Sequence, residues 1–169
     1  MAGKKFDVVL SHKWEACIGD EVQKIYHTLQ EMGHSVWFDK VEMQGASKTV
    51  LRDAVRNSMV FLCCASKGYF GSEICKQDLV YAAEQKKQII FLRMEEFDFS
   101  QSISKFIAAN EQYFKFYSNR SNPLSGELFT EEMHKLNAAI HNIKGMLKNK
   151  FVFIGTVNEF LKCDRVLIS

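Results

Sequence analysis

Five short apolar runs alternate along the chain with amphipathic segments. The runs are rich in Val, Ile and Phe, which is typical of β-strands. They lie at Phe6–Ser11, Ser35–Phe38, Met59–Cys64, Gln88–Leu92 and Tyr113–Tyr117. The third run is apolar at every position, as expected for a central strand that is covered on both faces of a parallel sheet.

Between these runs, apolar residues recur at spacings of three and four, which predicts helices. The helices are expected from Asp20 to Gly33, around Val50–Val55, at Ser72–Gln85, around Ile103–Ile107 and at Met133–Leu147. The first should begin with a capping box of Asp20 and Gln23 and end at Gly33. Residues 65–71 and 118–127 are predicted to be loops.

The alternation of strands and helices predicts an α/β fold. Right-handed crossovers place the helices on both faces of a parallel sheet, so we expect a flavodoxin-like, open, five-stranded sheet of order 2-1-3-4-5. One domain should cover residues 1–150. Residues 151–169 are expected to form a C-terminal extension packed on the same domain, with an edge strand at Phe151–Gly155 and a short helix.

Composition narrows the possible partners. The 169 residues are 47% hydrophobic and 25% charged, as in a single globular domain. A net charge of +2 predicts neither a nucleic-acid nor a membrane partner. No apolar run approaches the roughly 20 residues of a membrane span. Five cysteines without CxxC spacing argue against disulfides and structural zinc, which favours a reducing, cytoplasmic location.

Candidate chemistry gathers after the first and third strands, because ligands of such sheets bind beyond the carboxyl ends of the strands. Ser11, His12, Lys13 and Trp14 follow the first strand, and the loop after the third leads to Asp78. These residues also have purely structural explanations. Trp14 could cover the end of the sheet, and Lys13 could be a solvated surface charge. Asp78 could be favoured by the helix dipole alone, because acidic residues are common near the starts of helices. Neither GxGxxG nor GxxxxGK[ST] occurs.

Four segments in order look like a known family. Phe6–His12 (FDVVLSH) resembles the opening box of Toll/interleukin-1 receptor (TIR) domains, and Val36–Asp39 with Glu42–Gly45 is similar to their second strand and BB loop. Ala54–Ser58 resembles the end of their second helix. Residues 66–79 resemble the family pattern S-x-x-Y followed by S-x-W-C-x-x-E-L. The resemblance covers roughly residues 5–147.

The resemblance implies a function in signalling or defence. Some TIR domains only assemble signalling complexes, whereas others cleave the nicotinamide–ribose bond of NAD to give linear or cyclic ADP-ribose. In the cleaving members the Glu of W-C-x-x-E is essential; that position is Asp78 here, and Ile74 replaces the Trp. NAD would be the substrate, with no separate cofactor or metal, and TIR domains would self-associate through the BB loop. The residues expected to contact NAD are Ser11, His12, Lys13, Trp14, Asp39, Glu42, Gly45 and Ser72.

Three functions follow from these residues. NAD cleavage needs a carboxylate that stabilises oxocarbenium character on the ribose, and Asp78 retains that charge on a shorter side chain. A non-catalytic scaffold acting by TIR–TIR contacts is the alternative. A phosphoacceptor receiver is disfavoured because the third strand ends in Cys63 and Cys64 instead of Asp. The hypothesis from the sequence is NAD hydrolysis through Asp78.

Overall fold

The computed structural model describes residues 5–13, 18–38, 48–98, 113–119 and 122–164. At residues 48 and 150–164 it describes the backbone alone. The predicted residues Trp14, Asp39, Glu42 and Gly45 lie outside the described part of the chain, as does the helix expected around Ile103–Ile107.

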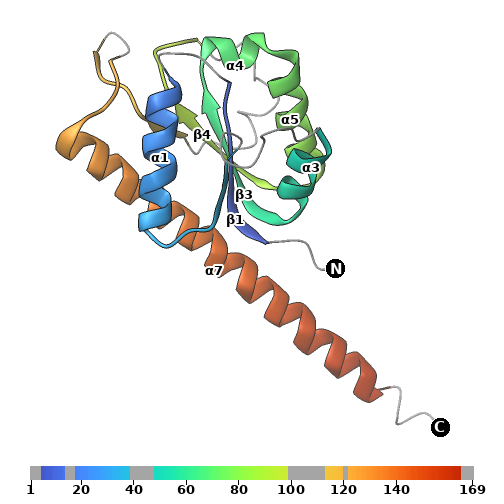
Figure 1. Ribbon diagram of the computed structural model, residues 1–169. Coiled ribbons are helices and arrows are strands. Elements are labelled where there is room, and N and C mark those ends of the chain that lie inside the picture. The colour runs from blue at the N-terminus through green and yellow to red at the C-terminus, as the bar shows by residue number, and fades with distance from the viewer. Residues whose placement is uncertain (1–4, 14–17, 39–47, 99–112, 120–121, 165–169) are drawn as a thin grey trace.

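Five parallel strands form one sheet in the order β2-β1-β3-β4-β5 (Figure 1). They are β1 (Phe6–Ser11), β2 (Val36–Phe38), β3 (Ser58–Ala65), β4 (Gln88–Arg93) and β5 (Tyr113–Lys115). In register, Leu10 of β1 pairs with Phe38 of β2 and with Leu62 of β3. The predicted flavodoxin-like fold class and strand order are confirmed.

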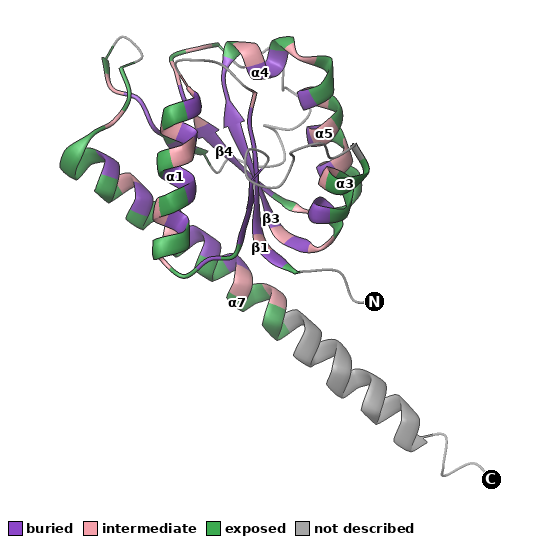
Figure 2. Ribbon diagram, viewed as in Figure 1, coloured by how far each residue is buried: buried purple, intermediate pink, exposed green. Residues whose placement is uncertain are grey.

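Helices cover both faces of the sheet and bury a separate apolar cluster on each (Figures 1 and 2). On one face lie α1 (Gly19–Glu31) and α7 (Gly126–Asp164), which contribute Ile25, Leu29, Leu136 and Ile140. On the other lie α3 (Lys48–Arg56), α4 (Lys67–Gly71) and α5 (Glu73–Glu84). Alternate residues of β1 and β3 point into the two clusters, so each central strand is buried on both faces.

The sequence predicts the C-terminal end of α1 correctly but not its N-terminal cap. The capping box of Asp20 and Gln23 is wrong: Ile18 is the N-cap, and no side chain caps the helix there. The stop at Gly33 is confirmed, with φ at +89° and hydrogen bonds from Gly33 N–H to Gln30 and from His34 N–H to Leu29. This is a Schellman motif, whose positive φ suits glycine.

Residues 65–71, predicted as a loop, contain the short helix α4. Ser66 caps it by accepting a hydrogen bond from Tyr69 N–H at 3.0 Å. A helix of five residues carries no apolar periodicity, so local pattern alone does not reveal it. The correction matters because α4 brings Tyr69 to the end of β1.

The edge strand expected at Phe151–Gly155 is also wrong, because α7 continues without a break to Asp164. Extending a helix adds one hydrogen bond per residue, and no proline interrupts this segment. In Figure 1 the last part of α7 runs past the sheet. Packing of residues 151–169 on the domain stays a prediction, since side chains from Lys150 onward are not described. None of the described helices is long and apolar enough to cross a membrane.

Candidate functional site

Ser11 ends β1 at the carboxyl edge of the sheet, where the sequence predicts a ligand contact. Its Oγ lies 2.9 Å from the hydroxyl of Tyr69, which comes from α4. Ser11 is 6% exposed and Tyr69 fully buried, and burial raises the pKa of the Tyr69 phenol well above its usual value. This hydrogen bond ties α4 to β1, so the observed contact of Ser11 is structural and its contact with NAD stays a prediction.

His12 is buried as well. Its ring centroid lies 5.0 Å from that of Phe38 in β2, and Phe38 stacks on Tyr26 of α1 at 4.8 Å. The imidazole therefore belongs to an aromatic row that joins β1, β2 and α1. Lys13, the next residue, is half-buried. Of the predicted residues after β1, Lys13 is the described one with the most access to solvent.

Asp78 lies on α5, which Ser72 positions. The Ser72 hydroxyl caps this helix by accepting from Cys75 N–H at 3.4 Å. Of the three carboxylates on α5, Glu73 and Glu84 are exposed, and Glu73 pairs with a neighbouring lysine. Asp78 alone is half-buried. The structure thus sets apart the carboxylate that the sequence singles out, although its role in catalysis stays a prediction.

The helix period shows which way Asp78 faces. Residues three and four apart share a helix face, so Asp78 lies in one stripe with Ile74 and Tyr81. Tyr81 contacts α3: its hydroxyl accepts from Arg56 Nε at 2.9 Å, and Arg52 lies 5.1 Å from its ring centroid. Asp78 therefore lies at the boundary between the buried face of α5 and the side that faces α3. From Ser72 to Asp78 the helix rises about 9 Å, so the carboxylate is set back from the carboxyl edge.

The described cysteines are unsuited to chemistry. Cys63, Cys64 and Cys75 are free thiols and buried. Burial raises the pKa of both the Cys63 and the Cys64 thiol, which disfavours the reactive thiolate. All three pack in the core as small apolar residues. The described residues contain no group of His, Cys, Asp or Glu that could hold a metal ion.

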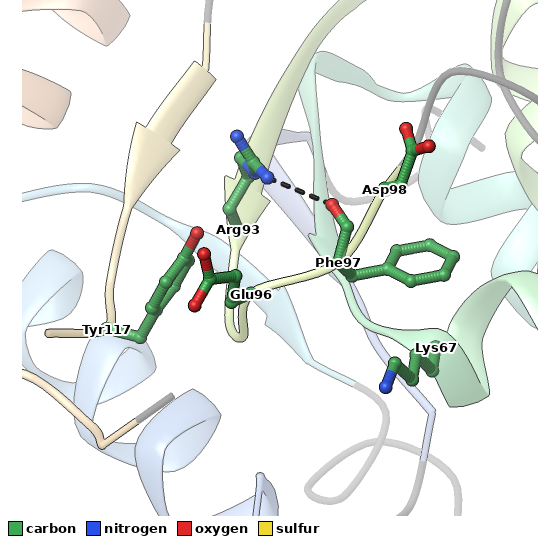
Figure 3. A pocket seen from close by; sticks show the side chains of 6 residues that line it. All are labelled: Lys67, Arg93, Glu96, Phe97, Asp98 and Tyr117. Carbon is green, nitrogen blue, oxygen red and sulfur yellow. Dashed lines mark hydrogen bonds between the residues drawn. The ribbon is translucent and has the colours of Figure 1, made fainter. Parts of the chain in front are cut away.

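A cavity that the sequence did not predict lies beyond the carboxyl ends of β4 and β5 (Figure 3). Its volume is about 520 Å³, and the described residues that line it are Lys67, Arg93, Glu96, Phe97, Asp98 and Tyr117. They come from α4, the end of β4, the loop after it and the segment after β5. The one signal in the sequence is the charged run that directly follows the fourth strand, because such runs at strand ends often carry function.

A second hollow of about 310 Å³ lies between α3 and α5. Arg52 of α3 and Gln77, Val80 and Tyr81 of α5 are among the residues that line it. Two apolar residues on α5, Ile74 and Val80, are 57% and 42% exposed. This surface borders the stripe that carries Asp78.

The fold is that of an open flavodoxin-like α/β domain, and its candidate site lies beside Asp78 on α5. The family model for the TIR domain matches residues 8–129. The chain belongs to the TIR domain family, as its sequence motifs predict.

Solved structures agree in fold. The TIR domain of the Toll-related receptor TRR-2 from Hydra magnipapillata is 16% identical, with 66% of this chain and 85% of that chain covered and a TM-score of 0.54. A TIR-STING receptor from C. gigas in complex with 2',3'-cGAMP is 11% identical, with a TM-score of 0.56. That match covers 76% of this chain and 38% of the receptor, so the chain spans well under half of its length. No curated protein matches the sequence.

Proposed function

We propose that this TIR domain binds NAD and cleaves its nicotinamide–ribose bond, leaving linear or cyclic ADP-ribose, within a self-associating signalling assembly. The observation that carries the proposal is the half-buried Asp78, which occupies the position of the essential Glu in the NAD-cleaving members of the family. The exposed carboxylates on the same helix show that burial here is specific to this side chain.

The chemistry needs one carboxylate near the ribose. As the bond between C1′ and the nicotinamide nitrogen breaks, its electron pair neutralises the pyridinium and positive charge develops on the ribose ring. A carboxylate in a half-buried position stabilises that charge more strongly than one in water, because the local dielectric is lower. In the linear product, water oxygen then bonds to C1′ and releases a proton. NAD is the substrate, and no further cofactor enters this step.

The burial of Ser11 and His12 changes how the substrate would be held. Both side chains pack against other elements, so we assign them to positioning α4 and β2 around the site. Direct contacts with NAD would come from Lys13, from Asp78 and from Trp14, Asp39, Glu42 and Gly45 of the flanking loops. The segment 39–47 leads directly into α3, which lies on the side of α5 that carries Asp78.

The test is nicotinamide release from NAD at high protein concentration. Asp78→Ala should lower the rate at least about a hundredfold, as removal of one group that stabilises transition-state charge commonly does. Glu84→Ala removes an exposed carboxylate from the same helix and should leave the rate unchanged. Equal rates in wild type and Asp78→Ala would reject Asp78 as the catalytic group.

The alternative is a scaffold that works through TIR–TIR contacts alone. Two exposed apolar side chains on α5 favour it, Val80 in the lining of the hollow and Ile74 on the same helix, because such side chains are typical of protein contact surfaces. Under this alternative, Ile74→Lys should reduce self-association measured by light scattering, whereas Met146→Lys on the exposed face of α7 should not. Absence of nicotinamide release from both wild type and Asp78→Glu, with self-association intact, would favour the scaffold.

A further inference from the structure

The last part of α7 extends beyond the domain. Among the residues whose side chains are described, Leu147 is the last on this helix that packs against the apolar cluster beneath α1 and α7. The helix itself continues to Asp164. At 1.5 Å per residue, the segment from Lys148 to Asp164 is about 26 Å long, and Figure 1 shows α7 running past the sheet. We refer to this segment as the α7 extension.

Contacts with the domain fix the direction in which the α7 extension leaves it. Lys144 Nζ lies 2.8 Å from the carboxylate of Asp7, near the start of β1, and both side chains are half-buried. Two turns earlier on α7, the Asn137 amide oxygen lies 2.6 Å from Nε2 of His34, which precedes β2. Both contacts lie at the amino ends of the strands. The α7 extension therefore leaves from the edge of the sheet opposite to the one where the sequence predicts the NAD contacts.

The sequence of the α7 extension places apolar residues along one face of the helix. Spacings of four and three alternate in the series Leu147, Phe151, Ile154, Asn158 and Leu161. This spacing defines the a and d positions of a heptad repeat, with Phe151 and Asn158 at a. Further apolar residues widen the face beside the d positions, namely Phe153, Val157 and Phe160. Gly155 and the β-branched residues lower the intrinsic helix propensity, so the helical state of the segment needs packing of this face.

We propose that this apolar face binds the same face of a second copy of this chain, with the two α7 extensions parallel. Asn158 selects this partner. It is the one polar residue in the a and d series from Leu147 to Leu161, and a single Asn at an a position sets the register of a parallel coiled coil. Asn158 would lie opposite Asn158 of the second copy, where the two amides can form a hydrogen bond. Against lipid or an unlike apolar groove, the amide would be buried without a partner.

The charges beside the a and d positions are compatible with the parallel register. In a parallel pair, position g of one helix lies close to position e of the next heptad in the partner. Lys150 would lie beside Gly155 of the second copy, and Val157 beside Lys162 of the second copy. No like charges meet at these two pairs.

Pairing of the α7 extensions would hold two TIR domains at the same end of the paired helices. The carboxyl edge of each sheet would stay open to NAD, because the helices leave from the amino ends of the strands. The proposal does not depend on NAD cleavage. For residues 151–164, pairing with a second copy takes the place of the packing on the same domain that the sequence predicts.

The test is sedimentation equilibrium of the 169-residue chain across the micromolar range. Wild type should form a dimer. Ile154→Lys buries a charge at a d position and should raise the dimer dissociation constant at least about tenfold. Val152→Lys introduces the same charge on the opposite face of the α7 extension and is the matched control, which should leave the dimer unchanged. Ile74→Lys on α5 should also leave this dimer in place, which separates it from the contact considered for α5.

Two further variants test the parallel register. Positions d face each other across a parallel pair at a distance that a disulfide can span. In a Cys163→Ser background, Leu161→Cys should therefore give a disulfide-linked dimer with oxidised glutathione, whereas Val152→Cys should not. Asn158→Leu should tighten association several-fold, because an Asn at an a position lowers the stability of a coiled coil.

All these α7 variants should keep the wild-type thermal midpoint at concentrations where the chain is monomeric, because the described packing of α7 on the core ends at Leu147. A wild type that stays monomeric across the micromolar range would overturn the proposal, as would equal dissociation constants for Ile154→Lys and Val152→Lys. A lower thermal midpoint in monomeric Ile154→Lys would mean that the segment packs on its own domain. Binding of a monomer to vesicles of phosphatidylcholine and phosphatidylserine, lost in Ile154→Lys, would assign the face to lipid. Unchanged association in Asn158→Leu would contradict the pairing of Asn158 and with it the choice of a second copy.

Discussion

His34 should make the attachment of α7 to the sheet sensitive to acid. The residue lies between α1 and β2 and is 4% exposed. Its Nε2 lies 2.6 Å from the Asn137 amide oxygen, so Nε2 carries the proton and Nδ1 is the basic nitrogen. Nδ1 is buried and has no hydrogen-bond partner among the described residues. A second proton on this ring would therefore be a buried and poorly solvated charge.

The charges around His34 come from β1 and α7. Burial lowers the pKa of His34 below its ordinary value of 6.5; Lys144 and His141 on α7 lower it further, while Asn137 and Asp7 oppose the shift. A base whose pKa is lower in the folded state binds more protons when unfolded. Its contribution to stability is therefore present above pH 6.5 and is lost as the pH falls from 6.5 toward the lowered value.

Asp7 titrates in a different window. Burial alone would raise its pKa, but the hydrogen bonds from Lys144, at 2.8 Å, and from Ser35 N–H hold the pKa below 3.8. The stabilisation by a carboxylate with a lowered pKa is present above the unfolded value and is lost only as the pH falls below it. Between pH 6.5 and 5, the acid sensitivity at this contact thus belongs to His34 and not to Asp7.

One proton taken up on unfolding changes the free energy of unfolding by at most about 1.4 kcal/mol per pH unit. His34→Gln keeps a side-chain donor for Asn137 but cannot titrate. In urea titrations from pH 7.5 to pH 5, wild type should lose stability below pH 6.5 more steeply than His34→Gln, by up to that amount per unit. His134→Gln, at an exposed position of α7, should keep the wild-type slope. Parallel profiles for wild type and His34→Gln would refute the reasoning.

Two further predictions concern stability. Ser11→Ala should lower the free energy of unfolding by about 1–3 kcal/mol, because it leaves the buried Tyr69 hydroxyl without this partner, and Ser11→Ala with Tyr69→Phe should cost less than the sum of the two single changes. If Ser11→Ala instead leaves stability unchanged and lowers nicotinamide release, Ser11 contacts the substrate. Gly33→Ala should destabilise the domain by about 1 kcal/mol because its φ is +89°, whereas Gly145→Ala inside α7 should raise the thermal midpoint slightly. A similar change in both glycine variants would contradict the conformational argument.

The sheet was predictable because β1 to β4 are mostly buried and therefore form runs of apolar residues. β5 differs, since Phe114 is buried between the exposed Tyr113 and Lys115. Every predicted strand agrees with the structure to within two residues at each end. The ends of helices were harder to predict. A glycine at the end of a helical pattern predicts a positive φ, and Gly33 has one. The N-cap, Ile18 instead of Asp20, depends on the path of the backbone before α1, which the sequence pattern does not specify.

The site was only partly predictable, for a physical reason. Ser11 and His12 carry polar groups at the end of a strand, which favours a ligand site in any sequence-based argument. What buries them are Tyr69 and Phe38, which lie far away in sequence. The cavity beyond the carboxyl ends of β4 and β5 is lined by residues from four separate segments, so the charged run after β4 is only a partial signal for it. Tertiary contacts decide which polar residues face a ligand, and spacing along the chain does not encode them.

Asp78 and Ile74 are the two departures from the family pattern, and they lie four residues apart on one face of α5. On this face Ile74 is exposed and Asp78 is half-buried. A carboxylate shortened by one methylene is displaced by about 1 Å or more from the ribose, a shift that can cost on the order of a hundredfold in rate. Asp78→Glu therefore distinguishes two explanations for the aspartate at this position of α5. Faster nicotinamide release would mean that distance limits an otherwise intact site, whereas slower release would mean that the surrounding residues have adapted to the shorter side chain.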